Sequence, residues 1–194
     1  MYDRGEILAI IDAVPMCHVG VSTPDGPIVL PMAHGRDDSH LFLHGAAANG
    51  LLNAGVDIDV CATFTIFDGL VLARSAFHNS VNYRSAVVRG TATKLSGDEK
   101  LWALRRISDH IVPTWDEGRP SSEAEIRGTI AISVPLAEMS AKRREGDPVD
   151  EPEDLQGPWW SGTVPLEQRW GTPMPAADLT PGIEVPPRLE HMRG

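Results

Sequence analysis

The apolar positions near the N-terminus follow first a helical and then a strand-like spacing. Between residues 3 and 14 the spacing is helical, and Pro15 ends the predicted helix, whose apolar positions are Ile7, Leu8, Ile10, Ile11 and Val14. Strands are then expected over residues 17–23, 28–34 and 40–45, joined by tight turns. Short strands connected in this way indicate an antiparallel meander.

The middle of the chain predicts a hairpin and a long strand. Residues 59–67 are rich in β-forming side chains, and the pair Asp68-Gly69 that follows them is the strongest hairpin signal in the sequence. The elements expected after this turn are a return strand over 70–76, a loop over 77–83 and a longer strand from Arg84 to Leu95.

Two capping signals predict helices in the second half. Ser96 and Glu99 form a capping box before an apolar stripe of helical spacing, and Ser122 and Glu125 form another before a shorter helix. With about seven strands, mostly hairpin-connected, and three or four helices, the chain predicts a mainly β fold: a small closed or split β-barrel with peripheral helices. An all-parallel sheet is not expected, because no helices separate the first three strands.

The C-terminal part changes character after its last strand. Residues 129–136 predict a core strand that continues through residues 140–144. Beyond Gly146 the chain is irregular and holds nine of the sixteen prolines. We therefore expect residues 1–146 to form the barrel, and residues 147–194 to wrap over it as an extension of the same domain.

Composition narrows the class of protein. The chain has 194 residues, is 42% hydrophobic and carries a net charge of −10 with a pI near 5.1, which argues against nucleic-acid binding. No apolar run approaches the roughly 20 residues that span a bilayer, and no signal-peptide pattern opens the sequence, so we expect a cytoplasmic protein without a membrane partner. Cys17 and Cys61 lie in strand-like runs and are expected to be buried free thiols.

Two polar clusters suggest an anionic ligand. In the first, Tyr83, Arg84 and Ser85 open an apolar strand, and the planar fork of an arginine beside a hydroxyl suits a phosphate. In the second, small residues between positions 44 and 50 lead into a predicted short helix that ends near Gly55. Backbone N–H groups at a helix start can bind an anion at close range. The simpler alternatives are a surface arginine and tight packing of small residues.

The remaining candidates also allow two interpretations. His44 and His78 are either ordinary structural histidines or neighbours of the phosphate site. The pair Trp159-Trp160 is either a hydrophobic anchor or a cofactor contact, and the basic run 142–146 is either a solvated face or the edge of an anion-binding groove. No metal-ligand spacing and no nucleophile motif is present, so a cofactor would have to supply the reactivity of an enzyme.

Four segments together resemble a known family: residues 41–52, 60–90, 132–154 and 158–166. They are similar to the pyridoxamine 5′-phosphate oxidase-like, FMN-binding split-barrel proteins, and most similar to the 5-nitroimidazole reductase-like subgroup. The resemblance implies a homodimer with two flavin sites in grooves between the subunits. It also implies an FMN-dependent oxidoreductase acting on a small organic substrate, such as a nitro-aromatic or a vitamer-like ring.

The resemblance also implies roles for individual residues. Arg84 and Ser85, with Tyr83 beside them, would contact the FMN phosphate. His44, Gly45, Ala46 and Asn49 would line the same pocket. Ser75 and His78 would approach the flavin ring or the substrate, which makes His78 and His44 the catalytic candidates. Trp159 and Trp160 would reach the flavin from the partner subunit. The alternative is a non-catalytic flavin- or haem-binding barrel, with haem held by His44 or His78, or a barrel that has lost its cofactor.

Overall fold

The computed structural model describes residues 3–47 and 57–190, and eight strands are found within these ranges. The strands are β1 (Met16–Thr23), β2 (Gly26–Arg36), β3 (His40–Ala46), β4 (Ile58–Leu72), β5 (Ser80–Lys94), β6 (Thr129–Pro135), β7 (Glu138–Arg144) and β8 (Gly162–Pro165). The helices are α1 (Arg4–Asp12), α3 (Gly97–Ile111), α4 (Glu123–Arg127), α5 (Pro187–Glu190) and the 3₁₀-helix η1 (Ala76–His78). The short helix expected to end near Gly55 falls largely outside the described residues.

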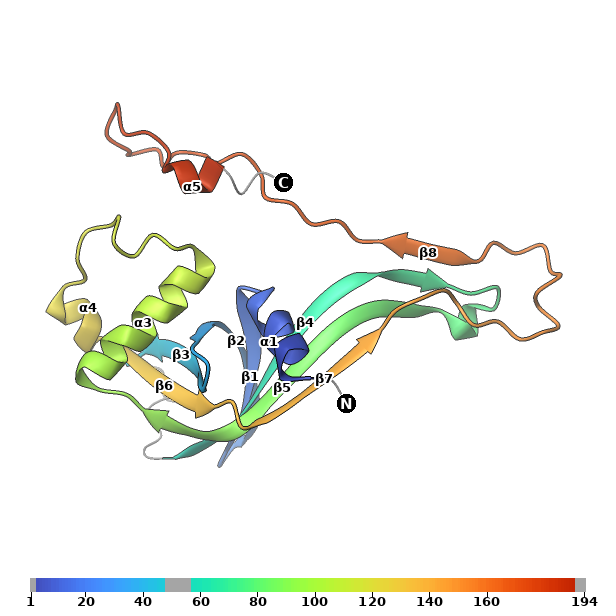
Figure 1. Ribbon diagram of the computed structural model, residues 1–194, viewed down its shortest axis with the longest axis horizontal. Helices are drawn as coiled ribbons and strands as arrows, with labels where there is room; N and C mark the ends of the chain where they lie inside the picture. The colour runs from blue at the N-terminus through green and yellow to red at the C-terminus, as the bar shows by residue number, and fades with distance from the viewer. Residues whose placement is uncertain (1–2, 48–56, 191–194) are drawn as a thin grey trace. The chain divides into compact units, whose positions relative to one another are not determined.

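Six strands close into a barrel (Figure 1). Their order is β5-β6-β3-β2-β1-β4, and β4 pairs again with β5, which completes the ring. β7 lies beside β5 and β8 beside β4. Neighbouring strands such as β1 and β2, β2 and β3, and β3 and β6 run antiparallel. The mainly β, split-barrel fold predicted from the sequence is confirmed.

The barrel core follows the alternation of side chains along each strand. On β4, Val60, Ala62 and Phe64 are buried in the main core cluster, because every second side chain of a strand points to the same face. Cys61 lies between them and is exposed, so the prediction that it is buried was wrong. Cys17 on β1 is buried as expected, and burial raises the pKa of its thiol to about 12.

The hairpin predicted at Asp68-Gly69 is absent, because β4 passes through this pair without turning. Gly69 has another use there. Its φ is +154°, and a Cβ at this position would lie 2.4 Å from the carbonyl oxygen of Val164 in β8. The glycine therefore permits the close approach of β8 rather than a reversal of the chain.

The strand predicted to run unbroken from residue 129 to residue 144 is interrupted. β6 ends at Pro135 and β7 begins at Glu138. Both segments pair with the same edge of β5, but Thr93 faces Ser133 whereas Arg89 faces Glu138, which is a shift of one residue in register. The break at Leu136-Ala137 therefore acts as a bulge between two parts of one long edge.

The two predicted capping boxes had different outcomes. At α4 the box is complete: the Ser122 side chain accepts from the Glu125 N–H, and the Glu125 side chain accepts from the Ser122 N–H. At α3, Ser96 is the N-cap residue but its side chain makes no capping hydrogen bond, so the box predicted with Glu99 does not form.

Helix α3 packs closely on the barrel at Gly35 of β2. A Cβ at Gly35 would lie 2.5 Å from the backbone C and O of Arg106, so only glycine allows this contact. Beside it, Ala103 and Ile107 of α3 are buried in a small cluster with Phe42 of β3 and Ala131 of β6. These contacts fix α3 against β2, β3 and β6, where it helps to form the pocket described below.

The chain divides into two compact units. The first comprises residues 1–67 and 81–147 and holds the barrel, and the second comprises residues 68–80 and 148–194. In the second unit, β8 pairs with the end of β4. That the extension wraps the barrel stays a prediction. None of the helices in the described ranges has the length and apolar character that crossing a bilayer requires.

Candidate functional site

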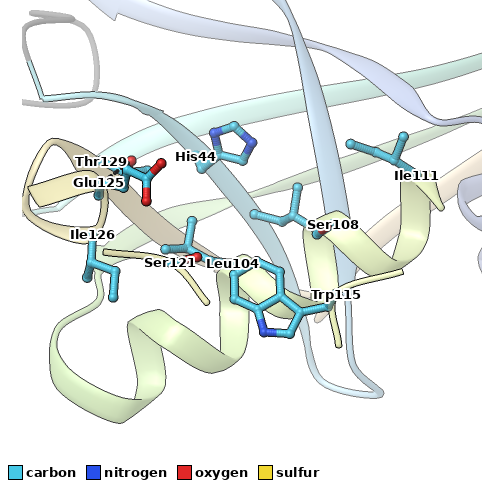
Figure 2. A pocket seen from close by; sticks show the side chains of 10 residues that line it. His44, Leu104, Ser108, Ile111, Trp115, Ser121, Glu125, Ile126 and Thr129 are labelled. Atoms are coloured by element: carbon cyan, nitrogen blue, oxygen red, sulfur yellow. Dashed lines mark hydrogen bonds between the residues drawn. The ribbon is translucent and has the colours of Figure 1, made fainter. Parts of the chain in front are cut away.

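The first unit contains a pocket of about 290 Å³ between β3 and the helical layer (Figure 2). This volume lies at the lower end of the range of ligand-binding pockets. The lining side chains come from β3, α3, the segment after α3, α4 and the start of β6; they are His44, Leu104, Ile107, Ser108, Ile111, Trp115, Ser121, Glu125, Ile126 and Thr129. We call this the His44 pocket.

The lining follows from local structure. The α3 residues Leu104, Ile107, Ser108 and Ile111 are spaced three or four apart, so they share one face of the helix. His44 follows three buried residues of β3 and is half-buried itself. The pocket walls thus combine four aliphatic side chains with polar ones, and one imidazole lies on the strand side.

The two titratable groups of the pocket differ in their availability. Burial lowers the pKa of His44, so its imidazole is neutral at neutral pH. Among the described residues no hydrogen-bond partner of this ring is found. Glu125 is already engaged: hydrogen bonds from Arg119 and from Ser122 hold the pKa of its carboxyl well below the usual range.

A second candidate site lies on β5 and β7. Tyr83, Arg84 and Ser85 face Arg144, Arg143 and Lys142, respectively, so the predicted phosphate-binding segment and the basic run are directly opposite each other. We call the four cations Arg84, Lys142, Arg143 and Arg144 the basic ladder. The sequence contained both halves of this site but gave no sign that they pair.

Contacts within the basic ladder hold its side chains at the strand surface. The Lys142 Nζ lies 6.0 Å from the centre of the Tyr83 ring, and the Arg144 Nη1 donates to Asn82 Oδ1 at 2.6 Å. Ser85 Oγ donates to the Lys142 carbonyl at 3.5 Å, and Arg143 forms an ion pair with Glu145. The strands and these contacts therefore concentrate positive charge in a protein of net charge −10.

Within one chain, the His44 pocket and the basic ladder are separate. Phe42 of β3 and Thr93 of β5 both pair with Ser133 of β6 and thus lie at one level of the barrel. Arg84 is nine residues further along β5, which is about 30 Å of extended strand. His44, Gly45 and Ala46 therefore do not join Arg84 and Ser85 in one site of a single chain. Asn49 lies outside the described residues.

The other predicted site residues belong to the second unit. Ser75 is the N-cap residue of η1, and His78 is its last residue. Trp159 and Trp160 are 58% and 64% exposed. Each ring folds back on a glycine, since a Cβ at Gly157 or Gly162 would meet the ring of Trp159 or Trp160. The roles predicted for these four residues stay predictions.

The second unit also contains a polar lock that the sequence did not indicate. The side chain of Asp150 is 1% exposed and accepts hydrogen bonds from the backbone N–H of Arg74 at 2.6 Å, from Arg74 Nη1 at 2.7 Å and from Ser161 Oγ at 2.9 Å. Burial alone would raise the pKa of Asp150, but these hydrogen bonds outweigh it and lower the pKa. The lock ties the proline-rich segment to the residue before Ser75.

The fold defines a split-barrel protein with two candidate sites. A family model described as pyridoxamine 5′-phosphate oxidase matches residues 3–143, and the chain belongs to this family. No curated protein sequence matches the chain.

Three solved structures are similar to this chain. The flavocytochrome Anf3 from Azotobacter vinelandii is 34% identical over 100% of this chain and 91% of its own, with a TM-score of 0.92. The FAD- and haem-binding protein from Mycobacterium smegmatis is 31% identical over 100% of this chain and 97% of its own, with a TM-score of 0.94. A candidate 5-nitroimidazole antibiotic resistance protein from Bacteroides thetaiotaomicron is 27% identical over 73% and 84%, with a TM-score of 0.60.

Proposed function

We propose that the protein is a flavin-dependent oxidoreductase that holds the flavin phosphate on the basic ladder. The observation that carries this proposal is the direct opposition of Arg84 and Arg143 across β5 and β7. The two arginine side chains share one face of the sheet, so both can reach a single bound anion. The arginine fork matches phosphate oxygens.

A bound flavin would supply hydride or electron transfer, and the chain would supply binding and orientation. FMN is the flavin expected from the sequence, while one of the similar structures is named for FAD. The two ligands share the phosphate next to the ribityl chain, so the basic ladder fits both. Chromatography of the cofactor released from the purified protein distinguishes FMN from FAD.

Arg84→Ala tests the phosphate site, with Arg89→Ala as its matched control. Arg89 lies on the same strand and pairs with Glu138 through an exposed ion pair of 3.4 Å. Loss of a hydrogen bond to a charged group costs about 1.5–3 kcal/mol, so Arg84→Ala should weaken flavin binding roughly 10- to 150-fold. Arg89→Ala should leave it unchanged. Equal flavin affinity of the two variants, measured by quenching of flavin fluorescence, would rule out the assignment.

Haem is a second candidate ligand, favoured by the His44 pocket. Its imidazole is half-buried, and burial lowers its pKa, which favours the neutral form that binds haem iron. The two similar structures that match all of this chain are named as a flavocytochrome and as a FAD- and haem-binding protein. These two structures match the chain to its end, whereas the family model matches it only as far as residue 143.

His44→Ala and His40→Ala test the haem candidate as a matched pair on one strand. His40 lies on β3 outside the His44 pocket. We expect His44→Ala to remove or shift the Soret band of the purified protein and His40→Ala to preserve it. A shift in His78→Ala instead would assign the ligand to η1. A purified protein that shows flavin absorption without a Soret band would refute the haem candidate and leave the flavin proposal standing.

We also propose that the protein acts as a homodimer. In the second unit, Val71 and Ala73 are the buried apolar side chains among the described residues. The exposed ones include Trp159, Trp160 and Trp170. Exposed aromatic side chains are enriched at interfaces, and a second copy of the chain is the partner that the family resemblance implies. Sedimentation at micromolar concentration should give a dimer, and a monomer would contradict this proposal.

A further inference from the structure

A single backbone carbonyl joins three segments of the first unit. The Val14 oxygen, in the connection between α1 and β1, lies 2.8 Å from Nε2 of His34 in β2 and 2.9 Å from Nε2 of His110 in α3. The two imidazole centres are 4.4 Å apart. A carbonyl oxygen has two lone pairs, so it can accept both hydrogen bonds at once.

This geometry determines where the protons of the two rings lie. Because both rings donate through Nε2, the neutral form of each has a bare Nδ1. The Nδ1 of His34 is buried and finds no partner among the described residues. The ring is 1% exposed and packs edge-on against Phe64 at 4.8 Å. A second proton on His34 would therefore be a buried charge without an acceptor, beside another imidazole.

The charged groups around the two histidines do not offset the cost of protonating the buried His34. Asp12 of α1 would favour a charged His34, but it already forms an ion pair with Arg36 of β2. Burial and the neighbouring His110 are the largest effects, and together they lower the pKa of His34 to about 4. The titratable and charged groups that face this site from α1, β2, the β2–β3 turn and α3 are Asp12, Arg36, Asp37, Asp38, Arg106, Asp109 and His110.

His110 differs from His34 in its surroundings. It lies in the last turn of α3, and its Nε2 reaches the Val14 carbonyl from the helix side. Acid sensitivity resides in His34, because a proton added to its buried ring would find no acceptor among the described residues and would lie beside a second imidazole 4.4 Å away.

The same turns of α3 form a wall of the His44 pocket. Ile107 and Ile111 line the pocket, while His110 between them reaches Val14. We propose that His34, His110 and the Val14 carbonyl form an acid-sensitive lock that holds the end of α3 on the barrel and keeps this pocket wall in place. The lock depends only on residues of the chain and requires no cofactor.

Hydrogen exchange of amides 107–112, in the last turns of α3 and at its C-cap, tests the lock, with rates corrected for the intrinsic effect of pH. A histidine with a pKa of about 4 in the lock and about 6.5 when released shifts the opening equilibrium roughly 20-fold between pH 7 and pH 5. Because the pKa of the released histidine is the higher one, the open state binds the proton more tightly. The hydrogen-exchange protection of α3 therefore falls as the pH falls. We expect a loss of protection of this size in the wild-type protein.

Three variants separate the lock from general acid sensitivity. His34→Gln can still donate to Val14 but cannot titrate, so protection should become independent of pH over this range. His110→Leu removes one donor and should lower protection already at pH 7. His18→Gln, at an exposed histidine of β1, is the control and should behave as the wild type. Pocket-wall protection that is equal at pH 7 and pH 5 in the wild type, or lost equally in His34→Gln, would overturn the proposal.

A direct titration covers the case in which His34→Gln does not fold. The pKa of His34 in the wild-type protein can be read from the pH dependence of its ring signals in NMR spectra. A value clearly below the ordinary 6.5 is expected, and an ordinary value would overturn the proposal without any variant.

Discussion

Replacing Gly35 with alanine should push α3 away from the barrel. The new Cβ would lie 2.5 Å from the backbone C and O of Arg106 and 2.6 Å from the backbone N of Ile107. Non-bonded carbon atoms prefer about 3.5–4 Å, so the helix must retreat by about 1 Å. No rotamer change can relieve the clash, because all three atoms belong to the backbone of α3.

The expected cost follows from the contacts that this retreat disturbs. Overpacking of this kind destabilises proteins by about 1–3 kcal/mol. The Arg106 Nε also donates to the Arg36 carbonyl at 3.0 Å, and loss of this hydrogen bond would add about 1 kcal/mol. The His110 contact with Val14, at 2.9 Å, lies on the same helix and should loosen with it.

Urea unfolding of Gly35→Ala and of Gly118→Ala gives the measurement and its control. A Cβ at Gly118 meets nothing within 4 Å, so this variant should unfold at the wild-type urea concentration or slightly above it. The Gly35 variant should unfold at a clearly lower concentration. If the two variants share one midpoint, the close packing of α3 on β2 is not what stabilises this part of the barrel.

Three further results are expected. At pH 8 a thiol reagent should modify the exposed Cys61 and spare Cys17 until the protein unfolds, because burial raises the pKa of Cys17 to about 12; mass spectrometry showing both thiols labelled in the folded protein would contradict this. Ser122→Ala should cost about 1 kcal/mol of stability through its lost cap, whereas Ser96→Ala, with no capping bond to lose, should cost much less; equal unfolding midpoints would argue against the caps described here. Asp150→Ala should speed proteolysis of residues 148–161 more than Glu153→Ala does, because Asp150 is buried and Glu153 is exposed; equal cleavage rates would mean that the hydrogen bonds of Asp150 to Arg74 and Ser161 do not restrain the segment.

The sequence predicted those parts of the fold that depend on local spacing. The first helix, the three-strand meander and the complete box at Ser122 are each determined within a few residues. The hairpin prediction at Asp68-Gly69 was wrong, because a glycine can serve close packing as well as a turn. Here the glycine allows the close approach of β8, which lies more than ninety residues further along the chain and could not be foreseen from the local pattern.

The residues of the candidate sites also fall into those that a local sequence pattern predicts and those that only the fold brings into place. Arg84 and Ser85 could be selected from their own neighbourhood, because a cation beside a hydroxyl at a strand opening is a local pattern. Trp115 and Ser121 of the His44 pocket could not, since their positions depend on how the segment after α3 returns to the barrel. Asp150 gave no signal either, because one carboxylate among several in a proline-rich segment looks like the others.

The composition of the basic ladder depends on one residue of register. Without the bulge at Leu136-Ala137, the pairing of β6 with β5 would continue unchanged and would place Lys142 opposite Arg84. With the bulge, Arg143 faces Arg84, while Lys142 and Arg144 move to the face of Ser85 and Tyr83. A shift of one residue exchanges the two faces of a strand, so the bulge decides which cations share a face. The charges in residues 142–144 are visible in the sequence, but the face on which each charge acts is set only when β7 pairs with β5.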